Sequence, residues 1–268
     1  MLRAVFIGFD PREAAAFAVA RNSVKRFLNR SVPVYGLVLS HLIEKGLYTR
    51  PTEWRPSAVD RPVMWDVISE HAMSTEHANS RFLVPHLQRL LSRVSFKSLG
   101  DKEPIYTQGH AGWAAFMDGD MLVRANLVRA AERLDGSKAV YCVHHNHAPT
   151  NTVKMDGQVQ SAYGRKNWSS FVLFNCDHPS NKALTVEMVN TLPGRDLHRF
   201  CWLKDDEIGE LGPEWNWLVG HSDPSVDPKV IHFTDGPPDM VGYENVPWAD
   251  EWRRERDMWA VGSLSLPG

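Results

Sequence analysis

Two carboxylates that could bind a metal ion stand near the middle of the chain. Asp118 and Asp120 flank Gly119, directly after the uncharged apolar run Trp113 to Met117. Such a run predicts a strand buried on both faces, and ligands of open α/β sheets bind where strands end. Paired carboxylates suit Mg²⁺ or Mn²⁺. The alternative is a plain hairpin turn, since Asp-Gly is a strong signal for one.

Two further side chains could complete such a site. His232 follows a short apolar segment and precedes Gly236, so it is a candidate third ligand, although a structural histidine fits the same pattern. Arg81 stands among apolar residues just before an expected helix. It is either a phosphate clamp, for which a planar guanidinium is suited, or half of a surface ion pair.

A histidine cluster follows another expected strand. His145 and His147 would share one face of an extended chain, while His144 would point away from it. No cysteine or carboxylate completes the set, so we favour a polar strand end that lines a cleft over a zinc site.

The segments between these residues predict alternating strands and helices. Asp10 can cap the first helix, with Pro11 at its first position. This order indicates a Rossmann-like layered fold, and the lack of a Gly-x-Gly-x-x-Gly motif argues against a dinucleotide cofactor. We expect a loop-rich excursion over 41–72. Expected strands are 4–9, 32–40, 113–117, 139–143, 171–175 and 229–236, and expected helices are 13–28, 85–94, 126–134, 181–192 and 245–259.

Composition limits the classes of protein. The 268 residues, 43% of them hydrophobic, predict a single domain over 1–268. A net charge of -2 gives no strong sign of nucleic-acid binding. The three cysteines are widely spaced, and the apolar N-terminal run is too short for a signal peptide or a membrane span. We therefore expect a cytoplasmic protein.

Together these motifs resemble the GT-A fold glycosyltransferases, and glycosyltransferase family 8 in particular. The patch that ends in Phe9 and Asp10 resembles the end of the family's first strand, which contacts the nucleobase. The patch that begins with Arg81 is similar to one that touches the nucleotide, and Asp118-Gly119-Asp120 resembles the Asp-x-Asp motif that holds Mn²⁺ on the donor diphosphate.

Three later patches extend the resemblance. Ser169 and Ser170 stand where the family has a patch lining the donor sugar, and His232 with Gly236 resembles the patch that supplies the third metal ligand. Asp205 and Asp206 resemble a region with an Asp-Gln pair, and they are candidate catalytic residues or an acidic helix start. The family's lysine after the histidine patch is missing here, because Pro237 and Pro238 follow Gly236.

The resemblance implies a fold and an activity. The fold is α/β and of GT-A type, with a mixed, mostly parallel central sheet and helices on both faces. The activity is transfer of a sugar, with retention, from a nucleotide-sugar donor such as a UDP-sugar to an acceptor that the sequence does not identify. The implied cofactor is Mn²⁺, or Mg²⁺ in its place.

Two other functions remain open at this point. A phosphatase of the haloacid dehalogenase kind also places Asp-x-Asp after a buried strand, but near the chain start, whereas Asp118 is mid-chain. A non-catalytic sugar-binding module could use the same fold, although it would not need Asp118, Asp120 and His232 together.

Overall fold

The main sheet carries the strand that leads into the paired carboxylates. The computed structural model describes residues 1–28, 31–56, 62–92, 94–95, 105–106, 110–145, 165 and 167–262. Six strands form the sheet in the order β12-β10-β11-β8-β1-β2. β1 is parallel to both of its neighbours, and β11 is antiparallel to both of its own. The bounds are β1 (Leu2–Gly8), β2 (Val34–Leu37), β8 (Trp113–Met117), β10 (Val140–Cys142), β11 (Phe171–Asn175) and β12 (Ile208–Glu210).

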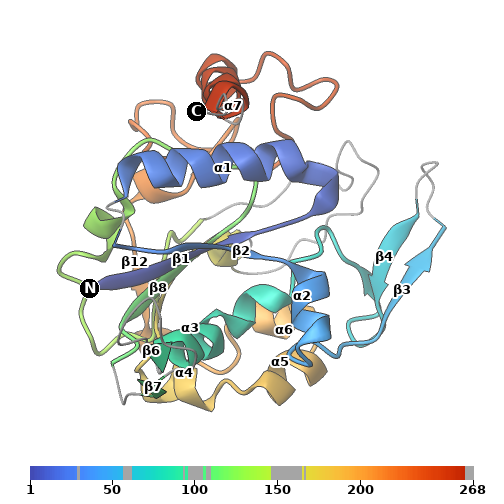
Figure 1. The fold of residues 1–268 in the computed structure, drawn as a ribbon, viewed down its shortest axis with the longest axis vertical. Helices are drawn as coiled ribbons and strands as arrows, with labels where there is room; N and C mark the ends of the chain where they lie inside the picture. Colours follow the sequence, from blue (N-terminus) through green and yellow to red (C-terminus); the bar gives the residue numbers. More distant parts are fainter. Residues whose placement is uncertain are drawn as a thin grey trace.

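Helices cover both faces of this sheet. α1 (Ala14–Phe27) and α7 (Ala249–Gly262) lie on one side (Figure 1). On the other side are α2 (Leu39–Glu44), α3 (Val84–Ser92), α4 (Pro179–Ala183), α5 (Val186–Thr191) and α6 (Gly194–His198). Alternate residues of one strand enter the two cores, since Phe6 packs in one cluster and Val5 and Ile7 in the other. The predicted α/β architecture, with its mixed sheet between two helical layers, is confirmed.

Most expected elements exist with altered bounds. The strands predicted over 113–117 and 171–175 match β8 and β11. The strand expected over 32–40 ends at Leu37, because α2 begins at Leu39. The helix expected over 126–134 is only a 3₁₀ turn, Leu127–Ala131, and the one over 181–192 is divided into α4 and α5. Each helix of the described chain is too short or too polar to cross a bilayer.

The expected loop-rich excursion is wrong in detail. Residues 41–72 contain part of α2 and an antiparallel sheet of β3 (Thr52–Arg55), β4 (Val63–Asp66) and β5 (His71–Ala72). Figure 1 shows β3 and β4 extending away from the main body. Neither strand has an apolar run long enough to be predicted from sequence, because much of the hairpin is exposed. The side chain of Trp54, for example, is 58% exposed. A further strand pair joins β6 (Val94–Ser95) to β7 (Ile105–Tyr106).

A second small sheet brings distant segments together. It has the order β13-β14-β9, with β13 (Trp217–Leu218), β14 (Val230–His232) and β9 (Met121–Val123). β14 runs antiparallel to β9, and His232 pairs with Met121. The strand expected over 229–236 is therefore present but shorter, as β14, while β9 had no counterpart among the predicted elements.

Candidate functional site

The two small-sheet strands β9 and β14 place His232 beside the paired carboxylates. β8 ends at Met117, the chain crosses Asp118 to Asp120, and β9 begins at Met121. Because His232 lies opposite Met121, and the Phe233 N–H donates to the Asp120 carbonyl at 3.1 Å, the imidazole reaches the acidic pair. Ligand atoms of Asp118, Asp120 and His232 all lie within 4.8 Å of one another.

The Asp-Gly-Asp turn is not a hairpin. β8 belongs to the main sheet and β9 to the small one, so the two strands do not pair with each other. Gly119 is needed for space, since a Cβ atom there would lie 2.5 Å from the carbonyl oxygen of Gly8. The turn therefore joins two sheets and packs against the end of β1.

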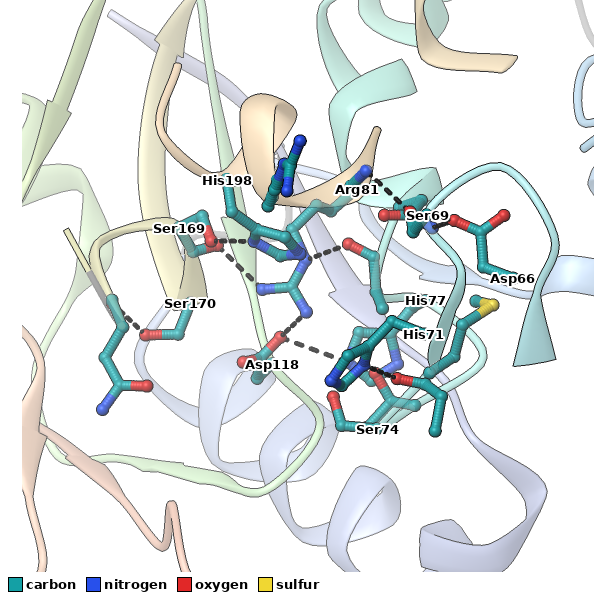
Figure 2. A pocket seen from close by; sticks show the side chains of 18 of the residues that line it. Asp66, Ser69, His71, Ser74, His77, Arg81, Asp118, Ser169, Ser170 and His198 are labelled. Carbon is teal, nitrogen blue, oxygen red and sulfur yellow. Dashed lines mark hydrogen bonds and ion pairs between the residues drawn. The ribbon is translucent and has the colours of Figure 1, made fainter. Parts of the chain in front are cut away.

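A cavity of about 350 Å³ opens beside these three residues. Its volume falls in the range of small-molecule sites. Half of the predicted site residues line it, namely Arg81, Asp118, Asp120, Ser169, Ser170 and His232. Figure 2 shows Arg81 between the Ser169 side and Asp118, with His198 close to it. The structure thus brings together segments that are more than a hundred residues apart in sequence.

Asp118 is held by two cationic or hydrogen-bonding side chains. Its Oδ1 atom lies 3.0 Å from Arg81 Nη2 and 3.1 Å from His77 Nε2. Burial raises the pKa of Asp118, but the opposing charge of Arg81 and the hydrogen bond from His77 hold that pKa well below its usual value. The carboxylate is therefore ionised, and one of its oxygens is fixed by protein contacts.

Arg81 is not part of a surface ion pair. It is 5% exposed, and its guanidinium packs 4.8 Å from the centre of the Phe116 ring. It donates to the Ala78 carbonyl at 3.0 Å and to the Ser169 carbonyl at 2.9 Å. A guanidinium has five N–H groups, so Arg81 can hold Asp118 and still direct others into the cavity.

Asp120 and His232 fit a divalent cation. Nε2 of His232 lies 3.4 Å from Asp120 Oδ1, and that buried oxygen has no hydrogen-bond partner among the described residues. A buried acceptor without a partner is costly, and a cation beside it would remove the cost. The two carboxylates and the imidazole are a ligand set that Mn²⁺ accepts, and Mg²⁺ less readily because it prefers oxygen alone.

Ser169 and Ser170 line the cavity, and the hydroxyl groups of both form hydrogen bonds within the protein. Ser169 Oγ lies 2.7 Å from His198 Nδ1, and Ser170 Oγ donates to the Asn167 carbonyl at 2.6 Å. Burial and the nearby charge of Arg81 lower the pKa of His198 to about 3, so its ring is neutral at physiological pH. His198 is thus an uncharged polar group on the cavity wall.

Four predicted donor-binding residues lie outside the cavity lining. Phe9 packs edge-on against Phe17 at 5.0 Å. Asp10 is 1% exposed and accepts from the Arg12 backbone and side chain and from the Glu76 N–H, so it caps the turn before α1 instead of facing a ligand. Gly119 and Gly236 are buried, each against its own neighbours.

Asp205 and Asp206 are also not brought to the cavity. They begin a 3₁₀ turn, Asp205–Glu207, which leads into β12. The side chain of Asp205 is 90% exposed and pairs with Arg165. Lys138 Nζ donates to the Asp206 carbonyl. The geometry favours the alternative in which these residues form an acidic start of a local element.

Sequence reasoning missed several cavity residues. His77 contacts Asp118, and Gly8 makes room for it, because a Cβ atom on Gly8 would lie 2.3 Å from the His77 ring. His198 and Asp66 come from elements whose positions depend on long-range packing. Nothing in the local sequence distinguishes these side chains from ordinary surface polar residues.

The histidine cluster does not join this site. His144 stacks on Trp168 with ring centres 3.9 Å apart, and neither His144 nor His145 lines the cavity. His147 lies outside the described residues. In the described part of the chain, the three-ligand group is the one at Asp118, Asp120 and His232.

Solved structures show the same fold. The bifunctional glycosyltransferase WbbM superposes with a TM-score of 0.52 and 14% identity, covering 95% of this chain and 51% of that one. The apo form of GlyE from Streptococcus pneumoniae TIGR4 gives a TM-score of 0.53 and 12% identity, covering 100% of this chain and 65% of that one. This chain therefore spans about half to two thirds of the length of these two solved chains.

One curated sequence is related over nearly the whole chain. No protein-family model matches the sequence. Protein CDI of Arabidopsis thaliana is 38% identical over 258 residues, which are 94% of this chain and 85% of that protein. Identity at this level over this length shows common descent, and the chain therefore belongs to the same family as Protein CDI of Arabidopsis thaliana.

Proposed function

We propose that this protein is a metal-dependent glycosyltransferase that moves a sugar from a nucleotide-sugar donor, a UDP-sugar, to an acceptor. The observation that carries the proposal is the meeting of Asp118, Asp120 and His232 beside a cavity of about 350 Å³. Its likeness in fold to two solved glycosyltransferases supports it. We also propose that residues 1–268 form a single domain.

The three ligating residues would hold Mn²⁺, with Mg²⁺ as the alternative. Such an ion, when bound, supplies Lewis-acid stabilisation of the charge that develops on a leaving diphosphate. Asp118, Asp120 and His232 come from a closely packed turn and a paired strand, so the chain holds them near one another before any ligand arrives. Preorganised charge of this kind is commonly a large catalytic contribution.

Arg81 would act on the same phosphate groups. It is buried against Phe116, where electrostatic interactions are stronger than in bulk water. Its contact with Asp118 keeps the carboxylate and the guanidinium at a fixed distance. Lys229 would not replace the missing family lysine, because its Nζ atom pairs with Glu214 at 3.0 Å.

The finer assignment rests on the resemblance to glycosyltransferase family 8, which implies a hexose donor and retention at the anomeric carbon. Asp205 and Asp206 play no part in the proposed reaction, since neither lines the cavity. Ser169 and Ser170 would shape the donor-sugar floor through their backbone, because their hydroxyl groups contact His198 and the Asn167 carbonyl.

A thermal-shift panel tests this proposal. The purified protein is melted with UDP, UDP-sugars and GDP-sugars, each with Mn²⁺, Mg²⁺ or EDTA. A UDP-sugar with Mn²⁺ at about a hundred times its Kd should raise the melting temperature by roughly 5 °C or more. Asp118→Asn should abolish the shift. Asp227→Asn is the matched control, since the side chain of Asp227 is 86% exposed and pairs with Arg124.

Release of UDP on addition of an acceptor pool would then establish transfer. The proposal fails if neither UDP nor any of the nucleotide sugars raises the melting temperature of the protein with either metal. Hydrolysis of an aryl phosphate with Mg²⁺ would instead support the phosphatase alternative. Donor binding without turnover by any acceptor or by water would support the non-catalytic module.

A further inference from the structure

Asn216, a residue outside the cavity lining, contacts the ring nitrogen of His232 that does not face Asp120. His232 Nδ1 lies 3.1 Å from Asn216 Oδ1, and the two residues are 3% and 0% exposed. The Asn216 amide nitrogen faces two acceptors, Ser170 Oγ at 2.9 Å and the Asn167 carbonyl at 3.3 Å. The amide nitrogen needs acceptors, so the Asn216 oxygen is the atom turned toward His232.

This orientation fixes the tautomer of His232. An amide oxygen only accepts, so Nδ1 of His232 carries the proton and donates it. In the form of the ring that binds a metal, Nε2 then carries a lone pair, and it faces Asp120 Oδ1 at 3.4 Å. Two lone pairs that face each other in a buried place repel, whereas a cation between them would bind both. Outer contacts of this kind orient metal-ligating histidines in general.

The segment 167–170, which accepts hydrogen bonds from the Asn216 side chain, also contacts the Asp118 side of the site. The Ser170 carbonyl accepts from the Asp118 N–H at 2.9 Å. The Ser169 carbonyl accepts from Arg81, and Arg81 in turn pairs with Asp118. The segment 167–170 therefore contacts Asp118 directly and His232 through Asn216, so that the two metal ligands share one support.

We propose that Asn216 is a positioning residue that presents His232 to the metal with Nε2 open, through the support of the 167–170 segment. The proposal rests on the metal site of the proposed function, and it adds a residue that touches neither the cavity nor the ion. Its chemistry is specific: a side chain at 216 must accept from Nδ1 of His232.

Two substitutions at position 216 separate positioning from packing. Asn216→Leu keeps a similar volume but accepts nothing, so Mn²⁺ affinity should fall about 10- to 100-fold. Asn216→Asp still accepts from Nδ1 and should hold Mn²⁺ within a few-fold of the wild type, although the metal-free protein should melt at a lower temperature because a carboxylate faces the Asn167 carbonyl. Affinity is measured without nucleotide, from the electron paramagnetic resonance signal of free Mn²⁺.

A buried asparagine elsewhere provides the matched control. Asn190 is 8% exposed, and its amide nitrogen donates to the Val186 carbonyl in α5 and to the Leu47 carbonyl after α2. Asn190→Leu should lower the melting temperature and leave Mn²⁺ affinity unchanged. Should Asn216→Leu fail to fold, Ser170→Ala removes one acceptor of the Asn216 amide and should produce a smaller loss of affinity.

The outcomes distinguish the two proposals. Weak Mn²⁺ binding by His232→Ala together with normal binding by Asn216→Leu overturns the role of Asn216 and leaves the metal site intact. Equal losses in Asn216→Leu and Asn216→Asp also overturn it, because a merely structural asparagine would give that result. Normal Mn²⁺ binding by His232→Ala overturns the metal site and the role of Asn216 together.

Discussion

The oxygens of Asp118 and the nitrogens of His232 have unequal surroundings. Arg81 and His77 both contact Oδ1 of Asp118, and Asn216 contacts Nδ1 of His232. One atom of each side chain is therefore fixed by the protein, which leaves the other for a ligand. Both residues could be predicted from sequence as candidate metal ligands, because Asp-x-Asp after an apolar run and a histidine at a strand end are local patterns. Sequence could not supply their partners, which come from distant segments.

Gly119 tests how tightly the turn from Asp118 to Asp120 is packed. We expect Gly119→Ala to destabilise the protein by about 1–3 kcal/mol, the usual cost of an extra methyl group in a packed place. The reason is the 2.5 Å distance from a Cβ atom to the Gly8 carbonyl oxygen, a backbone atom that cannot move aside cheaply. Denaturant unfolding of both proteins measures the difference, and Mn²⁺ affinity should fall with it because Asp118 and Asp120 are displaced.

Gly136→Ala is the control for this change. A Cβ atom there has no heavy atom within 4 Å, so its effect should stay within about 0.5 kcal/mol. If Gly119→Ala proved as mild as Gly136→Ala, the turn would be looser than the structure indicates.

At the scale of elements, buried runs could be predicted and short pairings could not. β8 and β11 were predictable because each is a continuous apolar stretch, with every residue of Trp113 to Met117 buried. β9 has three residues and follows a turn signal, so nothing local marks it as a strand. Its existence depends on β14, which is over a hundred residues away. His232 could be proposed as a third ligand from its place after a short apolar segment and from the family resemblance, but its pairing with β9 could not be predicted.

The excursion over 41–72 supplies one wall of the cavity through a buried ion pair. Arg50 Nη2 lies 2.5 Å from Asp66 Oδ2, and both side chains are at most 1% exposed. Arg50 also donates to the carbonyls of Val189 and Leu192 in and after α5. Asp66 accepts from Asn79, and Asp66 lines the cavity. This network joins the small antiparallel sheet to the helical layer.

Removing Arg50 should therefore be costly. We expect Arg50→Met to destabilise the protein by about 3–5 kcal/mol, because Asp66 would remain as a buried charge without its partner. Arg55→Met is the comparison, since Arg55 pairs with Glu53 where the side chains are 43% and 54% exposed, and such pairs contribute about 1 kcal/mol or less. Chemical denaturation of the three proteins provides the free energies, and similar values for both variants would contradict a structural role for the Arg50 network.

At the scale of the whole molecule, the last helix packs against the small sheet β13-β14-β9. Trp252 of α7 is 0% exposed and belongs to a core cluster with Leu122, Ile231 and Phe233. Glu255 accepts from Asn22 and pairs with Arg26, both on α1. The chain ends that these contacts join are more than two hundred residues apart. Packing of α7 therefore supports the strands on either side of His232.

We accordingly expect Trp252→Ala to lower the stability of the entire protein and not only of its C-terminal helix. Loss of a fully buried tryptophan costs about 3–5 kcal/mol, whereas Trp54→Ala, at a residue that is 58% exposed, should change stability by about 0.5 kcal/mol or less. If 1–268 is a single cooperative domain, far-ultraviolet circular dichroism and tryptophan fluorescence of Trp252→Ala will follow one common transition, shifted to lower denaturant. An early, separate transition of the helix signal alone would show that α7 unfolds independently, and the single-domain proposal would then be wrong.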